Sequence, residues 1–163
     1  MQQLTAKNLK QLIDNPENHS PSIDGVPYDR NTIQPSVVHF GVGNFHRCHQ
    51  AVYMDSLLRQ GSDSWGMIGV SMRSANTRDV LKPQDFLYTQ VTLGGQANFR
   101  IIGSILDILV APEDPGAVVK LVAEKSTKLV TTTITEKGYC LSSGNIDHSH
   151  TDISADKASL DKP

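Results

Sequence analysis

Cysteine is scarce in this sequence, and long apolar runs are absent. The 163 residues include two cysteines, Cys48 and Cys140. Two are too few for the disulfide framework of a small secreted domain, so we expect reduced thiols and a cytoplasmic setting. No stretch approaches the roughly 20 apolar residues of a membrane span. The first residues lack the basic and apolar segments of a signal peptide, so none is expected. With no apolar span and no basic excess, a membrane partner is not expected either.

An excess of charge of either sign is also missing. The formal net charge is -2 at pH 7 and the sequence pI is near 6.3. A nucleic-acid-binding surface usually requires a basic excess, so we expect no nucleic-acid partner. The hydrophobic share of 38% in 163 residues is enough for one domain with a buried core.

A pair of glycines between a strand and a helix organises what is present. Residues 37–40 are β-branched and aromatic, which predicts a buried strand, and residues 45–60 predict a helix that ends at Gly61. Gly41 and Gly43 lie between them, in the layout that places a pyrophosphate at a helix N-terminus. The usual third glycine is missing, and His46 stands in its place. The glycine spacing by itself therefore fits both a dinucleotide site and an ordinary turn.

The residues around the glycines resemble a known family. The segment HFGVGNFHRCHQAVY, residues 39–53, is similar to the GxGxFHRAHQ fingerprint of the polyol-specific long-chain dehydrogenases, with Cys48 where alanine is usual. This family includes mannitol 2-dehydrogenase and fructuronate reductase (mannonate oxidoreductase). Residues 133–139, TITEKGY, resemble its second segment, TxTExGY, and Lys137 is closer to the fructuronate reductase form.

The resemblance implies an NAD-dependent oxidoreductase, with NADP left open as cofactor. A hydride would pass between nicotinamide and a polyol or sugar acid, of the mannitol/fructose or mannonate/fructuronate type. The family's catalytic lysine lies in a C-terminal substrate domain within a KxxxxNxxH motif, and no such motif occurs in these 163 residues. We therefore expect no catalytic residue in this chain, apart from a candidate auxiliary role for Glu136, and a substrate domain outside it. The alternative is a truncated, non-catalytic module that binds a nucleotide or a partner chain.

The expected fold is α/β: a Rossmann-like, doubly wound, mainly parallel sheet with an inserted antiparallel hairpin. Residues 1–35 should form a helix over residues 5–13 and a proline-rich extended arm that packs on the domain. Residues 36–140 should form the NAD-binding Rossmann domain. Residues 141–163 have few core-forming side chains and predict a polar loop or a disordered tail.

Within the Rossmann domain the pattern predicts its strands and one further helix. Strands are expected over residues 65–71 and 129–135, and a further extended run over residues 104–110. Two β-rich runs flank Gly94-Gly95 and predict the hairpin, over residues 86–93 and 99–104. Asp114-Pro115 predicts a capped helix start.

The candidate cofactor-binding residues lie on the first strand, the glycine turn, the helix start, the tip of the second strand and the end of the last strand. They are Val37, Val38, His39, Phe40, Gly41, Val42, Gly43, Asn44, Phe45, His46, Arg47, Cys48, Arg73, Asn76 and Thr135. For Arg47 a phosphate contact and a salt bridge on the helix face are both open. For Cys48 we expect burial against the sheet and no redox role.

The tip of the second strand lacks the acid that commonly selects NAD. Ala75-Asn76 stands where some mannitol dehydrogenases carry Glu-Asp, and a short helix capped by Ser74 is expected there. Asn76 could hydrogen-bond a ribose hydroxyl. Arg73 and Arg78 could meet a 2′-phosphate, although a solvated loop is the better interpretation for Arg78.

No metal site is expected. His46 and His49 are three apart on the predicted helix and should share a face, which helix packing explains better than a metal because no acid or cysteine completes a site. His148 and His150 are two apart, again with no third ligand evident from the sequence.

Overall fold

The computed structural model describes residues 4–14 and 23–160. The prolines at positions 16 and 21 of the expected arm lie outside these ranges. The chain forms two compact units, Met1–Thr133 and Ile134–Pro163, and each is described by itself. Among the described residues, no helix is both long and apolar enough to cross a membrane.

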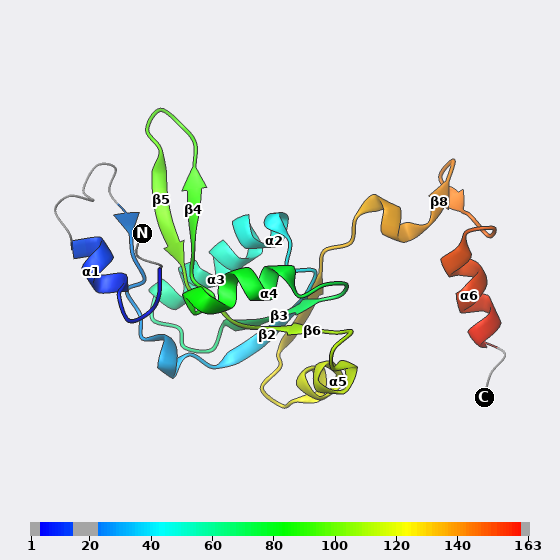
Figure 1. Ribbon diagram of the computed structural model, residues 1–163, viewed down its shortest axis with the longest axis horizontal. Coiled ribbons are helices and arrows are strands. Elements are labelled where there is room, and N and C mark those ends of the chain that lie inside the picture. The colour runs from blue at the N-terminus through cyan, green and yellow to red at the C-terminus, as the bar shows by residue number, and fades with distance from the viewer. Residues whose placement is uncertain (1–3, 15–22, 161–163) are drawn as a thin grey trace. The chain divides into compact units, whose positions relative to one another are not determined.

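A four-stranded parallel sheet forms the centre of the first unit (Figure 1). Its strands are β2 (Pro35–Phe40), β3 (Gly66–Ser71), β6 (Ile105–Val110) and β7 (Leu129–Thr132), in the spatial order β6-β3-β2-β7. The chain builds outward from β2 in one direction and then returns to its other side with β7. This reversal is the topological switch point of a doubly wound fold, where ligands bind at the carboxyl ends of the strands. The predicted parallel sheet is confirmed, including the extended run that becomes β6.

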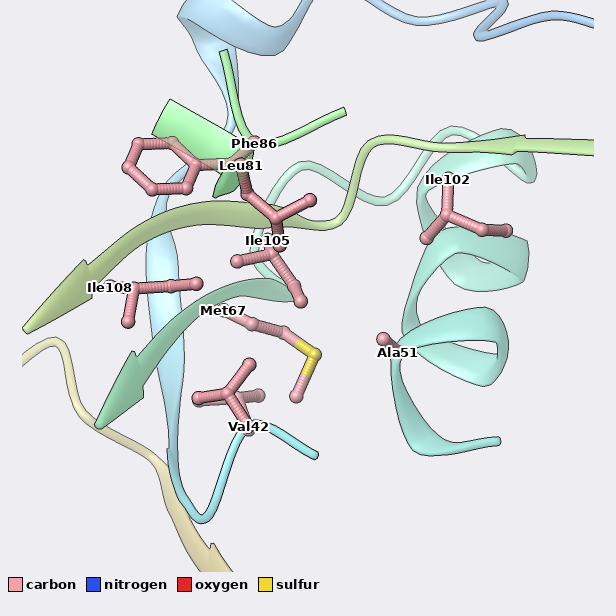
Figure 2. Packing of buried hydrophobic residues seen from close by; sticks show 9 residues of the cluster. Val42, Ala51, Met67, Leu81, Phe86, Ile102, Ile105 and Ile108 are labelled. Atoms are coloured by element: carbon pink, nitrogen blue, oxygen red, sulfur yellow. The ribbon is translucent and has the colours of Figure 1, made fainter. Parts of the chain in front are cut away.

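The two faces of this sheet carry separate cores, because neighbouring strand residues point to opposite sides. Val37 packs with Met67, Ile105 and Ile108 on the side of helix α3 (Gln50–Arg59), where Ala51 faces them (Figure 2). On the other face, Val38, Val70 and Val118 pack together under helix α5 (Pro115–Ala123). Helices therefore cover both faces of the sheet, with α3 and α4 (Asn76–Leu81) opposite α5 (Figure 1).

The start of α5 follows the sequence prediction. Asp114 accepts a hydrogen bond from the backbone N–H of Ala117 at 2.8 Å, and Pro115 takes the first helical position. Both devices are local, which is why they could be recognised without the tertiary structure.

The predicted hairpin is also confirmed. β4 (Tyr88–Thr92) and β5 (Asn98–Ile102) pair antiparallel, and β1 (Ile23–Asp24) from the N-terminal arm adds a parallel strand to β5. A short 3-10 helix, η3 (Lys82–Gln84), follows α4 and leads toward the hairpin.

The described part of the N-terminal arm after residue 22 packs on the domain. After β1 it forms a 3-10 helix, η2 (Arg30–Thr32), and Arg30 donates to the carbonyls of Gly103 at 3.0 Å and Ile105 at 2.8 Å. Helix α1 (Leu9–Asp14) begins later than the predicted residue 5. Thr5 and Asn8 form a reciprocal capping arrangement in the turn before it: the Asn8 N–H donates to Thr5 Oγ1 at 3.3 Å, and the Thr5 N–H donates to Asn8 Oδ1 at 2.8 Å.

One buried carboxylate ties the arm, α3 and the hairpin together. Asp55 is fully buried on α3. It accepts hydrogen bonds from the Tyr28 hydroxyl, from Arg59 Nε at 2.7 Å, from Arg100 Nη2 at 2.6 Å and from the Gly103 N–H at 3.0 Å. Burial by itself would raise the pKa of Asp55, but these donors outweigh it and lower the pKa below its usual range. Asp55 is therefore ionised and fully paired.

The second unit differs from the predicted polar loop. It contains a 3-10 helix, η4 (Glu136–Tyr139), a small hairpin of β8 (Leu141–Ser142) and β9 (Asn145–Ile146), and helix α6 (Thr151–Leu160). No residue of α6 is buried, so packing does not explain the helix. The helix start is supported locally, because His150 Nδ1 accepts the N–H of Asp152 at 3.2 Å. The alanines and the lysine within α6 are good helix formers. The prediction of a loop relied on the small number of core-forming side chains and did not weigh this helix propensity.

Candidate functional site

The first glycine of the turn is required by the chain itself. Gly41 has φ +96, a conformation that L side chains rarely adopt, and a Cβ there would lie 3.1 Å from the carbonyl oxygen of Thr133. Its N–H continues the β2–β3 ladder by donating to Val70 O at 2.9 Å. On the other side of β2, Thr133 N–H donates to Phe40 O at 3.0 Å. Gly41 therefore makes the sharp turn by which the chain leaves β2, with β3 on one side and the β7 segment on the other.

The second glycine is not required by the folded chain. Gly43 has φ -83, and a Cβ there would have no neighbour closer than Gly41 O at 3.9 Å. Gly43 precedes helix α2 (Asn44–Cys48), and the first helical bond runs from Arg47 N–H to Gly43 O at 3.1 Å. The N–H groups of Asn44, Phe45 and His46 precede that bond and are the ones that a helix start leaves for an external acceptor. The exposed backbone at Gly43 and these N–H groups form a cradle that suits an anion.

The residue between the glycines anchors the turn in the core. Val42 is buried, and a Cβ at Gly69 on β3 would lie 2.5 Å from Val42 Cγ2. Figure 2 shows Val42 close to Met67 of the core cluster. Gly69 thus leaves the space into which Val42 packs, and this fixes the height of the turn above the sheet.

Arg47 also holds the turn. Its guanidinium donates to Val42 O at 2.8 Å and to Asn44 Oδ1, while its own carbonyl accepts from the Tyr88 hydroxyl at 2.7 Å. Within the described part of the chain Arg47 forms no salt bridge, and its guanidinium is instead engaged by Val42 and Asn44. The guanidinium places a positive charge at the turn, where its hydrogen bond to Val42 O holds it in position.

The two histidines of the fingerprint do not share a face, which corrects the prediction. His46 is 1% exposed and stacks on His39 of β2, with ring centroids 3.6 Å apart and planes 7° apart. His49 is exposed and stacks on Phe45 at 4.4 Å. His46 therefore packs inside the domain, against β2.

The single predicted helix over residues 45–60 is divided at His49. Its Nδ1 hydrogen-bonds to Phe45 O at 2.9 Å, the carbonyl that an unbroken helix would offer to the His49 N–H. That N–H instead donates to His46 O at 3.3 Å. The division leaves Cys48 exposed at the end of α2, so the predicted burial of Cys48 against the sheet is wrong.

At the tip of β3 the side chains of Arg73 and Asn76 are exposed, whereas Arg78 is engaged in ion pairs. Arg78 pairs with both oxygens of Glu113, one at 3.1 Å from Nη2, and with Asp79 at 2.9 Å. Helix α4 begins at Asn76 with Ala75 before it and no side-chain cap, so Ser74 does not cap it as predicted. Among the described residues, Arg73 forms no ion pair, so of the two arginines at this tip it is the one whose charge is not paired with a carboxylate.

The remaining predicted residues are less closely tied to the turn. The side chains of Val37 and Val38 lie in the two cores beneath it. Thr135 is exposed in the second unit and Glu136 begins η4 there, so neither is placed relative to the turn. His150 lies near Cys140 and Asp152, and not in a pair with His148. This group stands at the start of α6, where the positive end of the helix dipole disfavours a cation.

Sequence reasoning missed three polar residues that support the turn. Thr131 and Thr133 of the β7 segment hydrogen-bond to His39 at 2.8 and 3.0 Å, and Gln50 meets both His46 Nδ1 at 3.2 Å and Thr131 at 3.1 Å. The threonines read as ordinary strand formers. Gln50 belongs to the quoted fingerprint, which was the one available signal.

Comparison with known proteins places this geometry in a family. The family model described as mannitol dehydrogenase Rossmann domain matches residues 35–160. The chain is 36% identical to a polyol:NADP oxidoreductase of Gluconobacter oxydans, over 98% of the chain and 33% of that protein. It is 37% identical to a mannitol 2-dehydrogenase of Pyrenophora tritici-repentis, over 95% of the chain and 27% of that protein.

Solved structures agree. The Pseudomonas fluorescens mannitol 2-dehydrogenase, in a ternary complex with NAD and D-mannitol, superposes with a TM-score of 0.81 at 36% identity, over 96% of this chain and 32% of that one. A D-sorbitol dehydrogenase in substrate-free form gives a TM-score of 0.77 at 34% identity, over 98% and 33%. The chain thus spans about a third of the length of these relatives.

Proposed function

Because this chain belongs to the mannitol dehydrogenase family, as its Rossmann domain, we propose that it binds NAD(H) at the glycine turn and orients nicotinamide toward a polyol. The supporting observation is Gly43, whose exposed backbone has open space where a side chain would fit. Bound nicotinamide supplies the hydride donor or acceptor, while the chain binds and orients it.

The residues present fit a dinucleotide. The pyrophosphate would lie over Gly41, Gly43 and the N–H groups at the start of α2, with Val42 and Arg47 holding the turn from below. The adenosine ribose would lie near Arg73 and Asn76 at the tip of β3. Val37, Val38, His39, Phe40 and His46 would support the turn, and Cys48 and Phe45 would flank it. Thr135 and Glu136 are proposed at the nicotinamide side on the resemblance of their segment.

In the whole protein the general base would come from a substrate domain outside this chain, and residues 36–140 would act as the cofactor domain. We favour a polyol substrate because the proteins compared above are named for mannitol, sorbitol or polyols. The setting is proposed as cytoplasmic, and NAD as the preferred cofactor with NADP permitted.

The purified 163-residue chain should bind NAD(H) weakly and turn over no substrate. Titration calorimetry with NAD+ and NADH measures the first, and absorbance at the nicotinamide band with mannitol, fructose, mannonate and fructuronate measures the second. Absence of binding would favour a partner-binding module instead. Turnover by the chain alone would show that the general base lies within it, which contradicts the proposal.

Replacing Asn76 with aspartate should sharpen the preference for NAD over NADP. A carboxylate at this exposed position would repel the 2′-phosphate, and Arg78 cannot easily compensate because Glu113 and Asp79 engage it. We expect NADP affinity to fall by about fivefold, while NAD affinity changes little. Titration of both cofactors against both proteins tests this, with Asp107→Asn as a control change of charge. Unchanged NADP affinity in Asn76→Asp would mean that the ribose lies elsewhere.

A further inference from the structure

We propose that His39 and His46 are positioning residues for the pyrophosphate of the bound dinucleotide. Their stacked rings set the spacing between β2 and α2, which the third glycine sets in the usual fingerprint, and His39 holds the Gly41 carbonyl beneath the turn. This inference rests on the proposed function, because it concerns the same turn.

The position of His46 carries the first step. In the three-glycine fingerprint, the last glycine stands three residues after the second and permits close helix–strand packing. Here that position is His46, and its ring lies flat against His39 at 3.6 Å between centroids and 7° between planes. Both rings are buried, at 2% and 1% exposed. The planar pair thus fills the helix–strand gap that a glycine would close.

The hydrogen bonds of His39 carry the second step. Its Nε2 lies 3.2 Å from Gly41 O, the same carbonyl that accepts the Gly43 N–H at 2.7 Å. With the ring proton on Nε2, that nitrogen donates to Gly41 O and, at 3.0 Å, to the Thr133 hydroxyl oxygen, while Nδ1 accepts from the Thr131 hydroxyl at 2.8 Å. His39 therefore links the glycine turn to the β7 side of the switch point. A shift of this ring would move the Gly41 carbonyl, and with it the Gly43 N–H that is hydrogen-bonded to that carbonyl.

The pair contributes no charge beneath the phosphates. Burial lowers the pKa of both histidines, and for His46, with further contributions from His39 and Arg47, to about 3. Both imidazoles are therefore neutral near pH 7. Their effect on an anion must come from the geometry of the turn.

The two rings differ in what they bind, and this asymmetry makes the inference testable. His46 Nδ1 meets Gln50 Oε1 at 3.2 Å, and His46 Nε2 is buried without a hydrogen-bond partner among the described residues. His46 is needed mainly as a flat ring. His39 is needed as a flat ring and as a hydrogen-bonding group. Phenylalanine should therefore substitute for His46 and not for His39.

The experiment measures binding of NAD+ and ADP-ribose to the 163-residue chain by calorimetry, with melting temperatures recorded for each variant. His46→Phe should keep both affinities within about threefold of wild type, whereas His46→Gly should weaken both by about tenfold. His39→Phe should also weaken both by about tenfold or more. The exposed His148 provides the matched control, and His148→Gln should change nothing.

Thr131→Val tests the link to β7 if His39→Phe does not fold, because it keeps both histidines and removes one hydroxyl that holds the His39 ring in position. We expect a loss of about threefold to tenfold in affinity for both ligands. Equal affinities in wild type, His46→Gly and Thr131→Val would overturn this inference alone. A loss in His46→Phe as large as in His46→Gly would also overturn it. Absence of NAD+ binding by the wild-type chain would overturn the proposed function, and this inference with it.

Discussion

Gly43→Val is expected to abolish dinucleotide binding while the domain stays folded. The backbone of Gly43 has φ -83 and ψ -177, which valine adopts readily, and its Cβ would have no neighbour closer than 3.9 Å. The new side chain would project into the open space where the pyrophosphate must approach the backbone. We expect NAD affinity to fall by at least about 100-fold with little change in melting temperature. Calorimetry and thermal denaturation measure the two effects separately.

Two other glycines serve as controls for this variant. Gly41→Val forces a side chain onto φ +96 and against Thr133 O, so it should lower both stability and binding. A Cβ at Gly95, in the hairpin turn, would meet nothing within 4 Å, so Gly95→Val should change neither. Unchanged NAD affinity in Gly43→Val would mean that the phosphates do not approach this turn.

Asp55→Asn should cause the largest loss of stability of any single change discussed for this chain. The fully buried carboxylate accepts from Tyr28, Arg59, Arg100 and the Gly103 N–H, so it compensates two arginines and one backbone donor. Neutralising it removes the buried anion from Arg59 and Arg100, which are partly buried, and leaves Arg59 only the exposed Asp24 as an ion-pair partner among the described residues. Breaking a buried ion pair from one side typically costs about 3 to 5 kcal/mol. Urea denaturation of the wild type and the variant measures the difference.

Asp24→Asn is the matched control, since Asp24 also pairs with Arg59, at 2.9 Å, but is 55% exposed. It should cost less than about 1 kcal/mol. A loss in Asp55→Asn as small as in this control would show that the arm, α3 and the hairpin do not depend on the carboxylate.

The pH dependence of the Asp55 effect follows from its lowered pKa. A carboxyl with a folded pKa below its unfolded value near 3.8 contributes its full stability above that value, and loses it as the pH falls through the folded pKa. The stability difference between wild type and Asp55→Asn should therefore be constant from pH 7 to about pH 5 and narrow below about pH 4. Denaturation curves at several pH values test this. A difference that is larger at acidic pH would contradict the lowered pKa.

The sequence by itself determined the features that depend on short-range chemistry. The buried strand before Gly41, the hairpin around Gly94-Gly95, and the start of α5 at Asp114 all depend on residues within a few positions of one another. The fingerprint around Gly43 identified the family for the same reason, because its residues are contiguous. These elements needed no knowledge of which segments meet in space.

The tertiary structure decided what distant residues do to one another. Nothing near His46 in the sequence reveals that its ring lies on His39, or that Thr131, some 90 residues later, hydrogen-bonds to that partner. Likewise Asp55 reads as an ordinary helix acid until Tyr28 and Arg100 arrive from other elements. Burial creates these roles, because a polar group removed from water must find its partners wherever the fold brings them. The linear sequence carries the groups, and only the packed sheet, with β7 beside β2, specifies the pairs.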